Sequence, residues 1–389
     1  MADSKTLAAT SNPKPIKTLL TSLIFQLKIW LLPILLAVVV LLFQVNTFDP
    51  APFPVHEFTN QRAAPIIAPK TNSRILWKSE FIGSRQLLGP EDIAYEPKSG
   101  IIYTGCVDGW IKRVKLGDSV SESVVEDWVN TGGRPLGIAI AIASSGDQLI
   151  VADAHKGLLK ITKNKEIQLL TDEAEGQKFK FTDGVDIAKD GTIYFTDASY
   201  KYGFQDYLLD ILEARPYGRL LSFDPNTKET KVLLHDLYFP NGVVISPDQN
   251  SLIFCETPMK RCRTYWIRGN RKGAVDSFID NLPGYPDNIH SDGKTKYWIA
   301  ISSSLSPYLE QANKFRLVRK AMSMVDRYIG LHHIQRNGGI LGVDLEGNAT
   351  LHVYDRAMSL ISSGIQIQDH LYIGSLHYAH IIRFNLSYL

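Results

Sequence analysis

Cysteine is scarce in this chain, and charge of neither sign dominates it. Three cysteines among 389 residues are too few for a fold held together by disulfides. A net charge of +2 gives no strongly basic face, so no nucleic-acid partner is expected. Gly-x-Ser-x-Gly, His-Glu-x-x-His and a phosphate-binding loop are all missing, which leaves serine esterase, zinc protease and nucleotide chemistry without support.

Two of the three cysteines lie seven residues apart, on either side of an expected hairpin turn. Cys255 and Cys262 could therefore pair in an oxidising compartment, leaving Cys106 free. Three buried thiols are the alternative.

A short pattern recurs along most of the chain. It has a turn residue, usually Pro, then two polar or small residues, then a β-branched residue that opens a strand. Its copies are residues 89–93, 134–138, 181–185, 239–243 and 285–289. The β-branched anchors, which end these copies, follow one another at steps of 45, 47, 58 and 46 residues. A period of about 40–50 residues with four strands per unit is typical of propeller blades.

The repeat predicts an all-β fold, a six-bladed β-propeller over residues 75–389. We assign the segments Gly339–Val343, His370–Gly374 and Ile381–Phe384 to the last blade. Helical insertions are expected at Gln205–Ala214 and Ser306–Leu331, where apolar residues recur at helical spacing. The second insertion could be a lid over the propeller mouth, a helix packed on a blade edge, or a helix on a membrane surface.

An uncharged run of 17 residues, 29–45, precedes the repeat. As a helix it would be about 26 Å long, close to the thickness of an endoplasmic-reticulum bilayer. No small-x-small cleavage site follows it, and Lys14 and Lys17 lie on its short N-terminal side. We therefore predict that residues 1–46 form a cytosolic stub and an uncleaved transmembrane signal-anchor, with a cleaved signal peptide as the alternative.

Residues 47–74 are predicted to be a proline-rich linker. The propeller would then be lumenal or extracellular, in a single-pass membrane protein of the endoplasmic reticulum, vacuole or plasma membrane. In that compartment Asn348 and Asn385, each in an Asn-x-Ser/Thr sequence, would be glycosylation acceptors.

One column of the repeat carries side-chain oxygens. Two positions before the anchors, and with Ile365 taken as the anchor of the sixth blade, the residues are Glu91, Leu136, Asp183, Asn241, Asp287 and Ser363. Because the innermost strands of a propeller surround one channel, equivalent positions converge on its axis.

Three carboxylates at one depth repel one another unless a cation joins them. Oxygen donors without His or Cys suit a hard cation, and Ca²⁺ fits better than Mg²⁺, which needs a tighter octahedron. We therefore predict that Glu91, Asp183, Asn241 and Asp287 bind Ca²⁺, with Asp92 and Asn288 behind them. The alternative is that these residues only cap turns.

Several motifs resemble the strictosidine-synthase-like family, which includes the adipocyte plasma membrane-associated proteins of animals. They occupy residues 133–137, 152–158, 218–225, 239–243 and 284–289. More distantly, the chain is similar to paraoxonase, gluconolactonase and phosphotriesterase propellers, which are calcium-dependent hydrolases. This resemblance implies that Glu91, Asn241 and Asp287 are calcium ligands, whereas Asp183 stands where those enzymes usually have Asn. It also places Ser363 where true strictosidine synthases have a catalytic Glu.

The leading hypothesis is a calcium-dependent hydrolase of small-molecule esters or lactones, with Asp287 as ligand and base or as nucleophile. A non-catalytic binding or scaffold propeller is one alternative. An amine–aldehyde condensing enzyme is another, although Ser363 is a poor replacement for the catalytic Glu.

Overall fold

The computed structural model describes residues 64–141, 148–304, 307–329 and 336–389, together with part of 31–52. The chain divides into two units, Met1–Asp49 and Pro50–Leu389. Much of the predicted signal-anchor lies outside the described residues. Within the described part, no helix is long and apolar enough to cross a bilayer. The anchor therefore stays a prediction.

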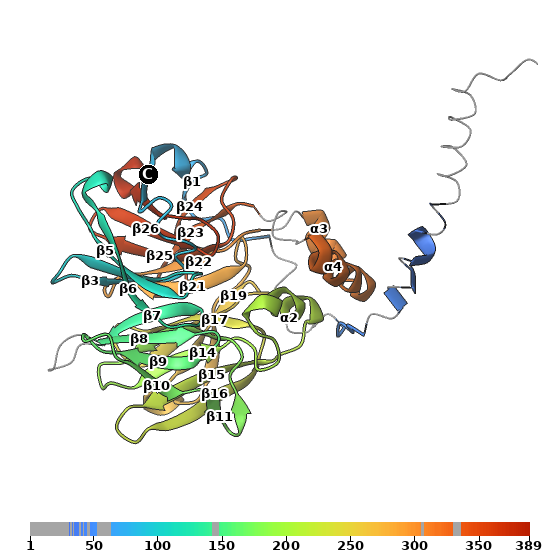
Figure 1. Cartoon of the computed structure of the whole chain (residues 1–389), viewed down its shortest axis with the longest axis horizontal. Coiled ribbons are helices and arrows are strands. Elements are labelled where there is room, and N and C mark those ends of the chain that lie inside the picture. The colour runs from blue at the N-terminus through green and yellow to red at the C-terminus, as the bar shows by residue number, and fades with distance from the viewer. Residues whose placement is uncertain are drawn as a thin grey trace, which may run out of the picture. The chain divides into compact units, whose positions relative to one another are not determined.

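The second unit is an all-β six-bladed propeller, as the repeat predicts (Figure 1). Blade one contains β3 (Ile93–Glu96), β4 (Ile101–Gly105), β5 (Trp110–Lys115) and β6 (Val124–Asn130). Blade two contains β7 (Pro135–Ala141), β8 (Gln148–Asp153), β9 (Gly157–Ile161) and β10 (Ile167–Thr171). Blade three contains β13 (Thr182–Ile187), β14 (Ile193–Asp197), β15 (Gly218–Asp224) and β16 (Glu229–Leu237). A hairpin of β11 (Glu173–Ala174) and β12 (Gln177–Lys178) precedes blade three.

Blade four contains β17 (Pro240–Ile245), β18 (Ser251–Glu256), β19 (Arg261–Trp266) and β20 (Val275–Ile279). Blade five contains β21 (Pro286–Ser291), β22 (Lys296–Ile301), β23 (Gly338–Asp344) and β24 (Ala349–Asp355), extended by the parallel strand β1 (Lys70–Asn72). Blade six contains β25 (Ile361–Ile367), β26 (His370–Ser375), β27 (Ile381–Asn385) and β2 (Ser79–Ile82).

The N-terminal strand β2 closes the ring. It pairs antiparallel with β27, so the outermost strand of the last blade comes from the start of the propeller sequence. Figure 1 shows the light blue segment around β1 beside the red C-terminal strands. The assignment of Gly339–Val343 to the last blade is wrong, because this segment pairs with β22 inside blade five. The helical insertion between β22 and β23 separates the two partners in sequence and hides their pairing.

Apolar side chains fill the spaces between blades. Because successive side chains of a strand point to opposite faces of its sheet, each strand packs against both neighbouring blades. On β22, Tyr297 and Ile299 pack in the cluster shared with blade four, while Trp298 and Ala300 pack in the cluster shared with blade six. All four side chains are buried. Both faces of a blade are therefore core, which explains why these strands are continuous apolar runs.

Glycines let the innermost strands meet at the axis. A Cβ at Gly184 would lie 2.6 Å from the backbone oxygen of Asn241 in the next blade. A Cβ at Gly242 would lie 2.5 Å from the backbone nitrogen of Ile289. Any larger residue would push neighbouring blades apart next to the oxygen-bearing column.

Both predicted helical insertions are present. The first contains η4 (Phe204–Asp206) and α2 (Tyr207–Glu213), between β14 and β15. The second contains α3 (Pro307–Ala312) and α4 (Arg316–Ile329), between β22 and β23. In Figure 1 these helices lie together at one side of the blades, and α2 contacts α4.

Candidate functional site

Four blades bring side-chain oxygens to one cavity. Glu91 precedes β3, Asp183 lies on β13, Asn241 on β17 and Asp287 on β21, and all four line this cavity of about 100 Å³. Their exposed fractions are between 1% and 6%, so they are desolvated despite facing a cavity. The structure thus brings together the four predicted ligands.

A bulge at the start of the innermost strand helps to aim these side chains. On β21, Pro286 pairs with Ile301 and Ile289 pairs with Ile299, so three residues advance along β21 against two along β22. Blades two, three, four and six have a register shift at the equivalent point. Such bulges re-aim side chains. In blades three, four and five the residue that follows the first pair is a site residue: Asp183, Asn241 and Asp287.

The register of β25 corrects the alignment of the sixth blade. Ile361 pairs with Ser375 and Gly364 pairs with Ile373, which makes Gly364 rather than Ile365 the equivalent of Ile289. Ser362 therefore occupies the oxygen-bearing column, one residue earlier than predicted. Its hydroxyl donates a hydrogen bond of 2.7 Å to the Glu91 carbonyl oxygen.

Two oxygens at the cavity are buried without a hydrogen-bond partner: Oε2 of Glu91 and Oδ1 of Asn241. Leaving such atoms unpaired costs about 1–3 kcal/mol each, and more for a charged group. The other Glu91 oxygen, Oε1, accepts a hydrogen bond of 2.8 Å from Nδ2 of Asn288. Because these two oxygens lack a hydrogen-bond partner, we expect a cation or a hydrogen-bond donor to bind in the cavity.

Simultaneous ionisation of the three buried carboxylates is energetically unfavourable. Burial raises the pKa of Asp287 to about 8. Burial and the neighbouring Asp287 also raise the pKa values of Glu91 and Asp183 well above their ordinary range. Arg134, itself buried, opposes both shifts but does not reverse them.

The donors at the cavity are oxygens of mixed charge. In the part of the chain that the structure describes, no three His, Cys, Asp or Glu side chains form a group that could hold a metal ion by themselves. Asn241 supplies a fourth, uncharged oxygen, and two of the site oxygens lack any partner. An all-oxygen set with excess negative charge and unsatisfied acceptors fits a hard divalent cation.

A second polar network, which the sequence did not reveal, lies beside the first. His290 Nε2 is 2.7 Å from Asp92 Oδ1, and the Ser363 hydroxyl donates to the same oxygen at 2.7 Å. Burial alone would lower the pKa of His290, but Asp92 raises it above its ordinary value. Burial alone would raise the pKa of Asp92, but His290 lowers it below its ordinary value. Asp92 also accepts a backbone hydrogen bond from Ile138, so it links blade one to blades two, five and six.

The walls of the cavity are apolar. They come from the blades and from the helical insertions. The blade residues are Leu136, Phe181, Phe239, Leu360 and Leu376, and the insertion residues include Phe204, Tyr207, Leu208, Ile211, Leu212 and Met322. The first insertion supplies most of these residues, and the second contributes Asn313 and Met322. We refer to η4, α2, α3 and α4 together as the lid.

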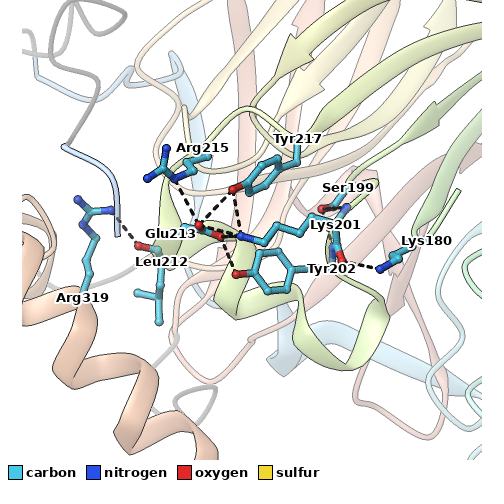
Figure 2. Close-up of polar contacts among 9 residues, drawn as sticks. All are labelled: Lys180, Ser199, Lys201, Tyr202, Leu212, Glu213, Arg215, Tyr217 and Arg319. Atoms are coloured by element: carbon cyan, nitrogen blue, oxygen red, sulfur yellow. Dashed lines mark hydrogen bonds and ion pairs between the residues drawn. The ribbon is translucent and has the colours of Figure 1, made fainter. Parts of the chain in front are cut away.

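A network around Glu213 holds the end of α2 in place (Figure 2). The buried Glu213 carboxylate accepts two hydrogen bonds from Lys201 Nζ, at 2.9 and 2.6 Å. The hydroxyls of Tyr202 and Tyr217 donate to it at 2.6 and 3.1 Å. Arg215 adds an ion pair at 3.3 Å. This network fixes one side of the lid to blade three.

Arg319 joins the two insertions. Its buried guanidinium donates from Nη1 to the Leu212 carbonyl oxygen at 2.8 Å and from Nη2 to the Ala51 carbonyl oxygen (Figure 2 shows the first of these bonds). Ala51 also donates its backbone N–H to the Glu213 carbonyl oxygen at 2.8 Å. The last carbonyls of α2, the start of the propeller unit and α4 thus meet at one point.

The remaining predicted residues lie away from the cavity. Cys255 and Cys262 face each other on β18 and β19 and form a disulfide, and Cys106 is a buried free thiol. Asn348 is exposed next to the turn after β23, and Asn385 is half-buried at the end of β27. Glycosylation of either residue stays a prediction.

Sequence comparisons place these features in a family. A strictosidine synthase model matches residues 183–270, and a strictosidine synthase-like N-terminal model matches residues 71–114. Strictosidine synthase-like protein 7 of Arabidopsis thaliana is 52% identical over 357 residues, which cover 92% of this chain and 94% of that protein. The mouse adipocyte plasma membrane-associated protein is 34% identical over 346 residues, covering 83% of this chain and 80% of that protein.

Solved structures share the fold at low identity. A gluconolactonase from Xanthomonas campestris has a TM-score of 0.57 and 15% identity, with 83% of this chain and 97% of that chain covered. The calcium-binding protein regucalcin of Agrobacterium tumefaciens has a TM-score of 0.56 and 12% identity, with coverage of 82% and 95%. These two structures show the fold alone, and the family follows from the plant and animal relatives. The chain belongs to the strictosidine synthase-like family.

Proposed function

We propose that this protein is a calcium-dependent hydrolase of apolar carboxylic esters or lactones. The observation that carries the proposal is the pair of buried, unpaired oxygens, Glu91 Oε2 and Asn241 Oδ1, at a cavity shared with two further carboxylates. The names of the structural neighbours, a gluconolactonase and a calcium-binding protein, agree with it.

Glu91, Asp183, Asn241 and Asp287 would hold the cation. When bound there, Ca²⁺ would polarise the substrate carbonyl and stabilise the negative charge that develops on its oxygen. Asn241 also acts on its neighbour, because its side chain hydrogen-bonds the Asp287 carboxylate and lowers the pKa of that group against the effect of burial.

Asp287 is the candidate catalytic residue. In its ionised form it accepts the proton of an attacking water molecule as a general base. Direct attack by the same carboxylate is the alternative. Single-turnover hydrolysis in ¹⁸O-labelled water identifies direct attack if the label is found in Asp287. Water would then have attacked the aspartyl carbonyl of an acyl–aspartyl anhydride, whereas a general base keeps both of its own oxygens.

The apolar walls select the substrate. Phe181, Phe239 and Leu136 surround the oxygens, and Met322 and Ile211 close the cavity from the lid. These side chains exclude water from the reacting group and favour an apolar ring or acyl chain over a sugar.

The condensing reaction of true strictosidine synthases has less support. The register of β25 brings Ser362 and Ser363, and no carboxylate, to the place where the resemblance expects a catalytic Glu. The Ser362 hydroxyl donates to the Glu91 carbonyl oxygen. The Ser363 hydroxyl donates to Asp92 and lies 3.2 Å from His290 Nε2, and neither serine is among the residues that line the cavity.

Metal analysis of the purified full-length protein, combined with a panel of lactones and aryl esters, tests the proposal. We expect bound calcium, hydrolysis that chelation abolishes and calcium restores, and loss of hydrolysis in Asp287→Asn. Asp118→Asn, an exposed carboxylate on a loop of blade one, is the matched control. If Asp287→Asn changes only the melting temperature, the protein is a binding or scaffold propeller; if hydrolysis survives full chelation, the metal mechanism is wrong.

Membrane attachment is a further part of the proposal. The uncharged run at residues 29–45 and the name of the animal relatives support an N-terminal anchor with the propeller on the lumenal or extracellular side. Protease protection of the propeller in intact microsomes, lost on adding detergent, would test this orientation.

A further inference from the structure

The inward side of α4 is used by the fold. Arg319 and Ser323 are buried, and Met322, on the same side of the helix, lines the oxygen-bearing cavity. These residues recur at the three- and four-residue spacing of one helix face. The opposite side of α4 is therefore turned away from the blades.

That outward side is itself divided into two stripes. Leu317, Ala321 and Val325 recur every four residues and are all exposed. Arg316 and Arg327 are exposed on the neighbouring stripe, at positions one and two residues from the apolar stripe's ends. Successive residues of an α-helix are rotated by about 100° around its axis. On a helical wheel of α4, the centre of the apolar stripe is therefore about 130° from the centre of the basic stripe. A helix with a solvent side that is half apolar and half basic has the composition of interfacial helices.

Large apolar residues are also exposed just before α4. Tyr308 on α3 is 88% exposed, Phe315 between the helices 65% and Leu317 68%. Single exposed apolar residues are ordinary on protein surfaces, but a group of large ones on one short segment indicates a contact surface. Exposed Lys314 lies within the same segment and adds positive charge.

We propose that this surface, Tyr308, Phe315, Leu317, Ala321 and Val325 with the flanking basic residues, rests on an anionic lipid bilayer. Basic residues beside an apolar stripe match anionic lipid headgroups above acyl chains. A second copy of the chain would bring two basic stripes face to face, which like-charge repulsion disfavours.

The position of the first residues of the propeller unit also supports a lipid bilayer as the partner of this surface. Ala51, the second residue of that unit, is hydrogen-bonded to Arg319 of α4 and to Glu213 of α2. A chain anchored by its preceding segment would therefore emerge at the lid. The inference does not rest on hydrolysis, and it holds for a non-catalytic propeller as well.

Contact of α4 with lipid would place the cavity at the bilayer surface, because Met322 faces the cavity from the same helix whose other side carries Leu317 and Val325. An apolar ligand dissolved in the bilayer could then reach the site without crossing water.

A fluorophore at position 317 tests this surface. The full-length protein carrying Leu317→Cys is labelled with an environment-sensitive dye and mixed with phosphatidylcholine vesicles that contain or lack phosphatidylserine. Native cysteines do not compete, since Cys106 is buried and the other two form a disulfide. We expect a blue shift of the emission and quenching by brominated lipids, both with phosphatidylserine only, and both lost in high salt.

Leu169→Cys, at a 52% exposed position on β10, is the matched control and should show neither effect. Adding Arg327→Gln and Lys314→Gln to the labelled protein should abolish the shift. Equal shifts at positions 169 and 317, or no shift with anionic vesicles, would overturn the proposal. So would a shift without vesicles that grows with protein concentration, which would identify a second copy as the occupant.

Discussion

Asn288 of blade five donates a hydrogen bond of 2.8 Å from Nδ2 to Oε1 of Glu91, which precedes the first strand of blade one. The bond joins blade five to blade one, which are separated by blade six, and it leaves Oε2 as the Glu91 oxygen without a hydrogen-bond partner. Asn288 is thus a positioning residue for the first donor of the site.

Asn288→Ala should weaken calcium binding by roughly 10–100-fold, the usual cost of losing a residue that orients a metal ligand. Isothermal titration calorimetry measures the effect directly. Asn226→Ala is the control, because Asn226 lies in an exposed turn and contacts Asp224 through its backbone N–H. Unchanged affinity alongside a lower melting temperature would show that the bond serves folding alone.

Calcium binding should depend on pH because the site holds protons in its absence. Burial raises the pKa of Asp287 to about 8, and those of Glu91 and Asp183 are raised as well. Since these folded-state values lie above the unfolded ones, the stability that they contribute without metal is present at low pH and lost as the pH rises through about 8. Calcium must displace the protons, so its affinity should rise over the same range.

Thermal denaturation with and without calcium checks this prediction. The calcium-induced rise in melting temperature should be larger at pH 8 than at pH 6, and Asp287→Asn should reduce the difference. An increase that is equal at the two pH values would contradict a site that titrates with the metal.

The sequence predicts this site where the turn before the innermost strand of a blade has a recognisable pattern. Glu91, Asp183, Asn241 and Asp287 each stand two positions before a β-branched residue, so their convergence could be read from the repeat. The sixth blade offers no such marker, because Ser362, Ser363 and Gly364 are all small and fit more than one register. In three blades glycine directly precedes the anchor, and in blades one and five Asp92 and Asn288 precede it. The sixth blade resembles blades one and five, because the polar Ser363 precedes its anchor Gly364.

Other features could not be read because they depend on distant pairing. His290 reaches Asp92 only after the bulge of β21 sets the direction of its side chain. The pairing of β23 with β22 is hidden by the α3–α4 insertion, and nothing in sequence shows that Arg319 bridges Leu212 and Ala51.

Asp210 on α2 should make the stability of the lid depend on pH. It is 2% exposed, and burial raises its pKa to about 7 despite a hydrogen bond from Ser199. Because the folded value is above the unfolded one, Asp210 stabilises the protein below about pH 4 and loses that contribution as the pH rises through about 7. The full effect is on the order of a few kcal/mol.

Asp210→Asn mimics the protonated acid and should flatten the fall in stability between pH 5 and pH 8. Saturating calcium in all samples keeps the titration of the cavity carboxylates from contributing. Asp206→Asn, an exposed residue of η4, should leave the wild-type profile unchanged. A profile for Asp210→Asn that falls as steeply as the wild type would refute the assignment.

Arg319→Met should loosen the lid without unfolding the blades. Methionine fills much of the same space but cannot donate to the carbonyl oxygens of Leu212 and Ala51, and a buried carbonyl left unpaired costs about 1–3 kcal/mol. Hydrogen exchange followed by mass spectrometry should show faster exchange in α2 and α4, with the strands of all six blades unchanged. Arg327→Met, at an exposed position of the same helix, is the control. Because α2 and α4 share the walls of the cavity through Ile211 and Met322, faster exchange of both helices together would show that the lid moves as one body; faster exchange of α4 alone would show that Arg319 holds only its own helix.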